Sequence, residues 1–340
     1  MKRTFLLCFI LLAWLHSAFG QATFNIDGFS EQYYGKVYFS DTTQTASAGW
    51  VEVYDRATNK KLIHVDANEL SFDLYDNPQK AYITKIPYEE QSAILYKDFN
   101  FDGVKDFAII DGFRNWTLGH SFKIFLASSK RFVFSDSFTE LTQDNQGMFT
   151  VNAINKTIST KSKIGDTWYQ YSDYIVENNK PKLIRRHTDD YEHAPFYRET
   201  IEELKGNKMV KTTRSSLALE RYHIEECFKF HVDKVNKDII LCNFYDDRLY
   251  YVILDAKQNV EFYYPFEELR QTSDFIFYRK NGKLTFKNKD ASYTIYDKSG
   301  NIGVDITYKG KTHRWKGNAK SRRGSIGKLL KGSLDNVVYQ

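Results

Sequence analysis

Short runs of alternating apolar and polar residues, rich in phenylalanine and tyrosine, recur about every ten residues along most of this 340-residue chain. Alternation with a period of two is typical of strands that have one buried face, and polar turn residues separate the runs. Long apolar stripes with the 3.6-residue period of a helix are absent. The pattern predicts an all-β protein built from hairpins and meanders, with short helices only near residues 266–270 and 326–331. The runs are GKVYF, GWVEVYD, KLIHVD, AYITKI, DFAIID, SFKIFLA, RFVFSD, WYQYSDYIV and PKLIRR.

The chain is longer than a single core usually serves, so two antiparallel β domains are expected. The polar stretch HTDDYEHAP, residues 187–195, lacks apolar alternation and ends in a proline. We expect it to link a first β domain at 22–195 to a second at 196–340. Periodicity is compatible with a sandwich, a barrel or a propeller-like arrangement and does not separate them.

The first twenty residues have the three parts of a secretory signal peptide. Lys2 and Arg3 precede an apolar run from Phe5 to Leu15, and the small residues Ala18 and Gly20 follow it. The run is shorter than the roughly 20 residues that a membrane-spanning helix needs. We therefore expect a protein exported to the periplasm or the extracellular space, with an uncleaved N-terminal anchor as the alternative.

Two of the three cysteines, Cys227 and Cys242, lie outside the predicted signal peptide. They are placed symmetrically about the polar turn 233–237, between the strand-like runs FKFHV and DIILCNFY. An antiparallel hairpin would set them opposite each other, and exported cysteines are commonly oxidised. The sequence predicts a Cys227–Cys242 disulfide, and two buried free thiols are the alternative.

The segment DFNFDGVKDFAIIDG has the spacing of a calcium-binding loop. Oxygen-bearing side chains occupy loop positions one, three, five and nine, a backbone carbonyl occupies position seven, and a glycine follows position five. Without a cation, acidic groups this close would repel one another. The predicted Ca²⁺ ligands are Asp98, Asn100, Asp102, Val104 through its carbonyl, and Asp106.

This loop differs from an EF-hand in two ways. Position twelve is Ile109 rather than a bidentate glutamate, and both flanks read as strands. We therefore expect a strand-framed calcium loop in which the ion braces the fold, with an ordinary turn rich in aspartate and asparagine as the alternative.

Residues from about Phe72 to Arg186 resemble a family of exported bacterial proteins whose β domain is similar to periplasmic lysozyme inhibitors. Some members act as immunity proteins against lysozyme-like effectors. The resemblance implies a calcium site on the loop residues named above, but it points to no inhibitory loop. It rests on the segments DFNFDGVKDFAIIDG, GHSFKIFLASSKRFVFSDSFTEL and WYQYSDYIVENNKPKLIRR.

Motifs for catalysis are missing from the sequence. It contains no G-x-S-x-G elbow, no H-E-x-x-H pair and no phosphate-binding glycine loop. His187 and His193 flank several acidic residues, which a solvated linker explains better than a metal or acid/base site does. We therefore expect a non-enzymatic protein, with a hydrolase of unrecognised motif as the weaker alternative.

Basic charge is concentrated near the C-terminus, where residues 306–334 carry nine Lys or Arg and no acid. Removing these nine charges and those of Lys2 and Arg3 from the total of +5 leaves about −6 for residues 21–305. Trp315, between Arg314 and Lys316, is a candidate anchor for an acidic surface, an anionic glycan or a lipid headgroup. A solvated basic strand and tail is the interpretation that the sequence favours, because charge runs are common on protein surfaces.

These features favour an exported calcium-binding protein that inhibits a lysozyme-like cell-wall hydrolase. Cationic lysozymes would be attracted to its acidic body. The alternative is a β module that binds glycans or the cell surface through exposed aromatic rings. Nucleic acid is not an expected partner outside the cytoplasm.

Overall fold

The computed structural model describes residues 20–71, 92–129, 131–192, 195–218, 227–244, 247–266 and 273–340. Residues 1–19 of the expected signal peptide, the expected strand at 81–86, His193 and most of the expected helix at 266–270 lie outside these ranges. In the described part of the chain, no helix is both long and apolar enough to cross a membrane.

Contacts between Cα atoms divide the chain into two compact units. The first comprises Met1–Thr188 and Ile201–Lys211, and the second comprises Asp189–Thr200 and Thr212–Gln340. The polar stretch 187–195 is not a linker throughout, because a strand continues to Asp190. This strand lacks apolar alternation because its residues are half-buried on both faces of the sheet.

Two four-stranded antiparallel sheets share the core of the first unit, and each follows sequence order. Buried residues alternate along β2, for example, as the apolar pattern requires. The buried side chains Phe39, Val51, Phe107 and Phe122 belong to the shared core. The strands are β1 (Ala22–Ile26), β2 (Tyr33–Phe39), β3 (Ala46–Asp55), β4 (Lys61–Ser71), β5 (Ile94–Lys97), β6 (Asp106–Asn115), β7 (Gly119–Ser128) and β8 (Arg131–Phe134).

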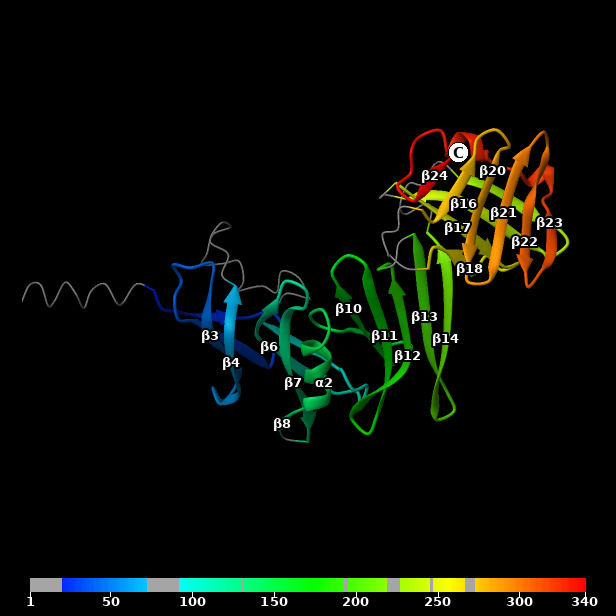
Figure 1. The fold of residues 1–340 in the computed structure, drawn as a ribbon. Coiled ribbons are helices and arrows are strands. Elements are labelled where there is room, and N and C mark those ends of the chain that lie inside the picture. The colour runs from blue at the N-terminus through cyan, green and yellow to red at the C-terminus, as the bar shows by residue number, and fades with distance from the viewer. Residues whose placement is uncertain are drawn as a thin grey trace, which may run out of the picture. The chain divides into compact units, whose positions relative to one another are not determined.

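Helix α2 (Asp136–Gln143) lies beside β7, as Figure 1 shows. The sequence analysis did not expect this helix. Its Phe138 and Leu141, three residues apart, are buried in the core of the first unit. The hydroxyl of Thr142 accepts a hydrogen bond from the Phe122 amide at 2.9 Å, and that of Thr139 accepts one from the Ile124 amide at 3.0 Å. The helix thereby satisfies backbone donors of β7.

A six-stranded antiparallel meander follows, in the order β14-β13-β12-β11-β10-β9. Asn178 and Asn179, both at positive φ, form the turn between β11 and β12. Asparagine tolerates this left-handed conformation better than most residues. The strands are β9 (Thr150–Asn152), β10 (Thr157–Ile164), β11 (Trp168–Glu177), β12 (Lys180–Asp190), β13 (Phe196–Lys205) and β14 (Lys208–Leu217).

The second unit contains two further sheets that contribute to one core, with Phe228, Tyr251, Phe275 and Ile295 buried in it. Their orders are β15-β16-β17-β18 and β23-β22-β21-β20-β19-β24. The elements are β15 (Cys227–Val232), β16 (Lys237–Phe244), β17 (Arg248–Leu254), β18 (Val260–Tyr264), β19 (Phe275–Tyr278), β20 (Lys283–Asn288), β21 (Ala291–Lys298), β22 (Asn301–Tyr308), β23 (Lys311–Lys316), the 3-10 helix η1 (Ala319–Ser321), α3 (Ile326–Leu329) and β24 (Val337–Tyr339).

The structure confirms the all-β prediction. In the described part of the chain, neighbouring strands pair antiparallel, except that β19 and β24 run parallel. The turn between β3 and β4 has Asn59 at positive φ, and the turn between β21 and β22 has Ser299 and Gly300 at positive φ. The expected short helix near residue 326 is α3.

Candidate functional site

The predicted calcium loop connects β5 to β6. Lys97 pairs with Asp106, so the two strands form an antiparallel hairpin that closes on residues 98–105. Strands therefore frame the loop on both sides, as the flanking sequence indicated. Phe101 and Gly103 have φ values of +63° and +90°. A Cβ at Gly103 would meet no atom within 4 Å, so the glycine is required by the backbone conformation and not by crowding.

Two of the predicted ligands hold the loop through backbone amides. The carboxylate of Asp98 accepts hydrogen bonds from the amides of Asp102 at 3.2 Å and Gly103 at 2.9 Å. Asp102 accepts one from the amide of Val104 at 2.8 Å. These contacts place the two carboxylates along the inside of the same turn. Each carboxylate oxygen has two lone pairs, so accepting one amide leaves capacity for a cation.

Asn100 is the predicted ligand whose side chain connects the loop to another turn of the first unit. It is 7% exposed, and its side-chain amide donates to Asp102 Oδ2 at 2.9 Å and to Asn179 Oδ1 at 3.1 Å. Asn179 lies in the turn between β11 and β12, which sequence reasoning did not connect to the loop. The two asparagines at 178–179 are a turn signal in the sequence, but nothing in the pattern gives the turn a partner.

Asp106 is fully buried at the start of β6. Its two oxygens accept hydrogen bonds from the amides of Phe99 and Ala127, each at 2.8 Å, which joins the loop to β7. Burial raises the pKa of Asp106 to about 6, and the neighbouring charges of Asp102 and Asp98 add to the increase, while the two amide bonds oppose it. A cation near this carboxylate would favour its charged form.

The donor set of the loop fits a hard cation in its chemistry. It offers carboxylate, side-chain amide and backbone carbonyl oxygens, and it has no nitrogen or sulfur ligand, which is the preference of Ca²⁺. In the described part of the chain, the carboxylate oxygens of Asp98, Asp102 and Asp106 do not all lie within 4.8 Å of one another. The three carboxylates accept hydrogen bonds from backbone amides of the loop and of β7.

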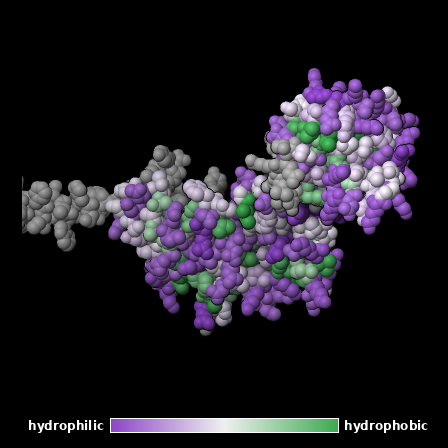
Figure 2. Space-filling model, viewed as in Figure 1, coloured by the Kyte–Doolittle hydropathy of each residue, from purple (hydrophilic) through white to green (hydrophobic). Residues whose placement is uncertain are grey.

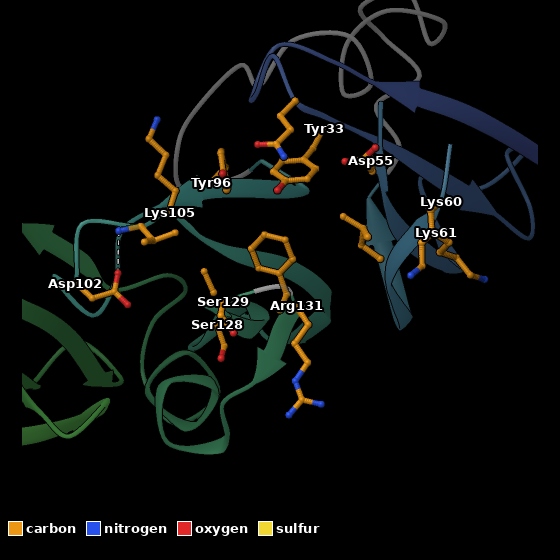
Figure 3. Close-up of a pocket in the computed structure, with 15 residues that line it drawn as sticks. Tyr33, Asp55, Lys60, Lys61, Tyr96, Asp102, Lys105, Ser128, Ser129 and Arg131 are labelled. Atoms are coloured by element: carbon orange, nitrogen blue, oxygen red, sulfur yellow. Dashed lines mark hydrogen bonds between the residues drawn. The ribbon is translucent and has the colours of Figure 1, made fainter. Parts of the chain in front are cut away.

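An open cleft of about 780 Å³ adjoins the loop within the first unit. Figure 3 shows Asp55, Lys60 and Lys61 on one side of it and Tyr96, Asp102 and Lys105 on the other. The rings of Tyr33, Tyr96 and Phe132 pack edge to face beneath it. The full lining is Gln32, Tyr33, Asp55, Lys60, Lys61, Leu62, Tyr96, Asp102, Val104, Lys105, Ala127, Ser128, Ser129, Arg131 and Phe132.

The charges of this cleft are mainly basic. Lys61 pairs with Glu52 at 2.7 Å, and Lys105 lies 5.5 Å from the centre of the Tyr96 ring. Within the described ranges, no carboxylate lies at ion-pair distance from Lys60 or Arg131. Val104, with its side chain 53% exposed, is the apolar residue that the loop presents here. The predicted calcium loop thus forms one wall of an open cleft.

Cys227 and Cys242 are direct partners in the β15–β16 register, as the symmetric spacing about the turn predicts. Both are free thiols in the structure, so the disulfide remains a prediction. A hydrogen bond from Cys242 lowers the pKa of Cys227, and the same bond together with burial raises the pKa of Cys242. The thiols are therefore in contact.

The structure separates the three residues of the predicted basic anchor. Trp315 is half-buried and packs against the core of the second unit, while Lys237 Nζ lies 5.7 Å from its ring centre. Arg314 and Lys316, its neighbours on β23, are exposed. Because successive side chains of a strand leave opposite faces, the tryptophan cannot act together with these two cations on one surface.

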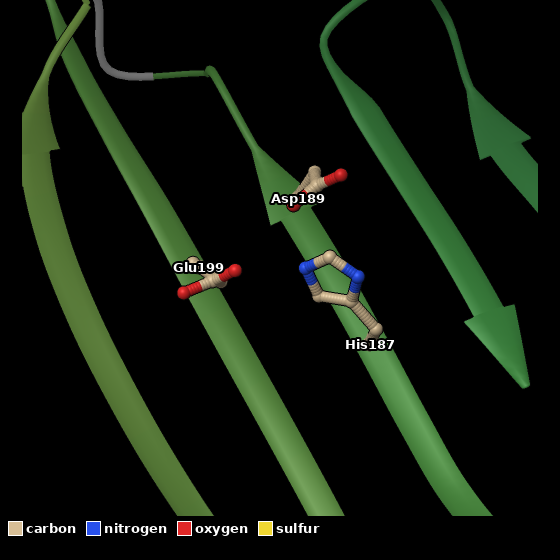
Figure 4. Close-up of side chains that lie close together, drawn as sticks. All are labelled: His187, Asp189 and Glu199. Atoms are coloured by element: carbon tan, nitrogen blue, oxygen red, sulfur yellow. The ribbon is translucent and has the colours of Figure 1, made fainter.

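A second acidic group lies on β12 and β13. The ligand atoms of His187, Asp189 and Glu199 lie within 4.8 Å of one another, and Figure 4 shows these side chains close together on the two strands. The Tyr197 hydroxyl donates to Asp189 at 2.6 Å, and burial, with this bond, raises the pKa of Tyr197. All three residues of the group have further interactions, so it is not a set of free ligands.

Comparison with known proteins gives no family. No family model matches the chain, and no curated protein matches it. Among solved structures, it is similar to a Xanthomonas type IV secretion system related protein, at 20% identity over 56% of this chain and 98% of that one, with a TM-score of 0.42. It is also similar to TolB from Acinetobacter baumannii, at 8% identity over 90% and 82% of the two chains, with a TM-score of 0.18. A third is the WD40 domain of Toxoplasma gondii coronin, at 7% identity over 86% and 69%, with a TM-score of 0.20. At these TM-scores, none of the three supports an argument about function.

Proposed function

We propose that this protein is an exported, non-enzymatic binding protein in which Ca²⁺ on the β5–β6 loop braces the wall of a partner-binding cleft. The supporting observation is Asp106, a buried carboxylate beside the charges of Asp98 and Asp102. A bound divalent cation would offset the repulsion among the three carboxylates.

The proposed partner is a lysozyme-like hydrolase that acts on the cell wall, which the protein would inhibit. The family resemblance of residues 72–186 supports this choice. The acidic charge of residues 21–305 would attract a cationic lysozyme to the molecule as a whole, whereas contact at the mainly basic cleft would depend on Val104 and the acidic residues Asp55 and Asp102. The loop residues Val104 and Lys105 face the cleft and are exposed. A partner seated there would therefore contact the part of the wall that the ion orders.

The test is inhibition of a panel of lysozymes by purified protein, measured with calcium and with chelator. We expect inhibition that calcium strengthens. Val104→Ser should weaken it by on the order of tenfold, as truncation of an interface anchor does. The variant leaves the Val104 carbonyl, and therefore the predicted ligand, in place.

The matched control is Ile154→Ser. Ile154 is 95% exposed in the turn between β9 and β10, away from the cleft lining. If both variants inhibit as well as the unsubstituted protein, the cleft wall is not the contact surface. If the unsubstituted protein neither binds nor inhibits any lysozyme in the panel, the proposed partner is wrong.

A further inference from the structure

A hollow of about 620 Å³ lies on the outer face of the second unit, across β20, β21, β22 and β23. We call it the sheet hollow. Figure 2 shows hydrophilic surface in the part of the view where Figure 1 labels β22 and β23. Its principal lining side chains are Lys283, Tyr296, Lys298, Asn301, Arg314 and Lys316.

The strand register explains why this face is hollow. Lys283, Tyr296, Gly303 and Lys316 are successive partners across the four strands, so they form one row on one face. A Cβ on Gly303 would lie 2.5 Å from the Tyr296 hydroxyl oxygen and 2.6 Å from the Trp315 carbonyl oxygen. The missing side chain therefore leaves room for the tyrosine to reach across β22, between the two lysines.

The hollow carries an excess of positive charge. Four cations, Lys283, Lys298, Arg314 and Lys316, line it together with one acid, Asp305. Arg314 lies 3.5 Å from Asp305 and remains 79% exposed. For the three lysines, no carboxylate of the described chain lies at ion-pair distance. Lys283 and Lys298 stand on adjacent strands, which are about 4.8 Å apart, and Lys316 lies two strands beyond Lys298. An anionic chain that crosses the strands could therefore pair with each of these cations in turn.

We propose that the sheet hollow binds an anionic oligosaccharide, whose acidic groups are carboxylates or sulfates. The cations would pair with the acidic groups, and the half-buried ring of Tyr296 offers an apolar surface to a sugar ring. Asn281, Ser299 and Asn301 add hydrogen-bonding groups at the rim for sugar hydroxyls. A shallow surface that crosses four strands suits an extended chain of sugars.

Other polyanions fit this hollow less well. Membrane-surface binding uses exposed apolar side chains, and none of the lining residues belongs to the exposed large apolar residues of the described chain. Binding of single-stranded nucleic acid uses several stacked aromatic rings, whereas this lining has one, Tyr296. The observations therefore favour a saccharide.

The experiment measures binding of the full protein to oligogalacturonate, which is carboxylated, and to heparin-derived oligosaccharide, which is sulfated. Neutral oligogalactose, anionic phospholipid vesicles and single-stranded DNA are the comparison ligands. We expect one or both acidic saccharides to bind more tightly than all three, with affinity that decreases as salt concentration rises. The two acidic probes distinguish which acidic group is preferred.

Lys298→Glu with Lys316→Glu should weaken saccharide binding by about tenfold or more, since each substitution replaces an attraction with a repulsion. Tyr296→Leu should weaken it while leaving the net charge unchanged. The matched control is Lys309→Glu with Lys311→Glu, at the β22–β23 turn. Lys311 precedes Lys316 by five residues on β23, so its side chain leaves the opposite face, and this control should change affinity less than about twofold.

Equal weakening by the control, or equal affinity for DNA or vesicles, would show nonspecific attraction to polyanions and overturn the proposal. Absence of binding to both acidic saccharides would also overturn it. Thermal unfolding checks that each variant is folded. Saccharide binding is measured in chelator, because the carboxylates of oligogalacturonate themselves bind Ca²⁺. This result is therefore independent of the calcium-dependent lysozyme assay.

Discussion

The side-chain amide of Asn100 donates a hydrogen bond to Asn179, 79 residues later in the sequence, at 3.1 Å. This bond joins the predicted calcium loop to the turn between β11 and β12. Because Asn100 also contacts Asp102, the turn orients one predicted ligand relative to another. The geometry of the loop therefore involves a residue far away in the sequence, which the loop sequence itself does not indicate.

Asn179→Gly tests that arrangement. Glycine retains the left-handed backbone and removes the side chain, so we expect a loss of about 1 kcal/mol in unfolding free energy. Calcium affinity should decrease as well. The matched control is Asn178→Gly, at the neighbouring residue of positive φ, because no side-chain contact of Asn178 with the loop is present in the described structure. Calorimetric titration with calcium and thermal unfolding provide both values, and identical behaviour of the two variants would contradict the prediction.

Calcium should raise the unfolding temperature of the protein. Binding to the folded state alone stabilises it by about 2.7 kcal/mol when the free ion is at 100 times its Kd. Asp98→Ala and Asp102→Ala should each abolish this increase, and an equal concentration of Mg²⁺ should not reproduce it. Asp136→Ala, an acidic residue of α2 outside the loop, is the control that should retain it. An unchanged unfolding temperature in the unsubstituted protein would refute calcium binding.

Asp106 should make stability depend on pH in the absence of calcium. Its pKa is about 6 when folded against an ordinary value of 3.8, so between these values the folded state holds a proton that the unfolded state has lost. Stability therefore decreases as pH rises through this window, by roughly 3 kcal/mol. Saturating calcium should remove the decrease, because the ion favours the carboxylate.

Asp106→Asn isolates this contribution. The difference in unfolding free energy between the variant and the unsubstituted protein should change between pH 4 and pH 7 without calcium, since asparagine does not titrate. Asparagine has one acceptor oxygen for the two amides that Asp106 now satisfies, so the variant should also lose stability at every pH. A constant difference across the pH range would show that Asp106 does not titrate in this window.

Oxidation should join Cys227 to Cys242. They are cross-strand partners with thiols in contact, and a loop of about 15 residues closed by a disulfide contributes about 3 kcal/mol before strain is subtracted. Mild oxidant should abolish thiol labelling and raise the unfolding temperature, and reductant should reverse both. Cys227→Ser should not respond to oxidant, and labelling that persists in the unsubstituted protein would contradict the pairing.

Short-range sequence patterns correctly predicted single strands and hairpin registers, which depend mainly on neighbouring residues. The alternation in residues 49–55 indicates β3, and the symmetry of Cys227 and Cys242 about their turn indicates their register. Helix α2 was missed because its eight residues follow directly on the strand-like RFVF and contain only two buried apolar residues, Phe138 and Leu141.

Of the remaining features, one is visible only in the tertiary structure, and another follows from the sequence once strand geometry is applied to it. The contact of Asn100 with Asn179 depends on how two distant hairpins pack, so the spacing of residues along the sequence does not predict it. The separation of Trp315 from Arg314 and Lys316 was available from the sequence, since adjacent residues of a strand face opposite ways. The prediction of a common anchor grouped these residues by their position in the basic run and did not apply the alternation of side chains along a strand.

The hydroxyls of Thr139 and Thr142 have a consequence for self-association. Beyond the short strand β8, β7 would present the amides of Phe122 and Ile124 as an open sheet edge, and open edges recruit strands from other copies of a chain. The two threonines of α2 occupy both donors with side-chain oxygens, which cannot propagate a sheet. A short amphipathic helix thereby protects a β-rich chain from edge-to-edge aggregation at the strand next to its predicted metal loop.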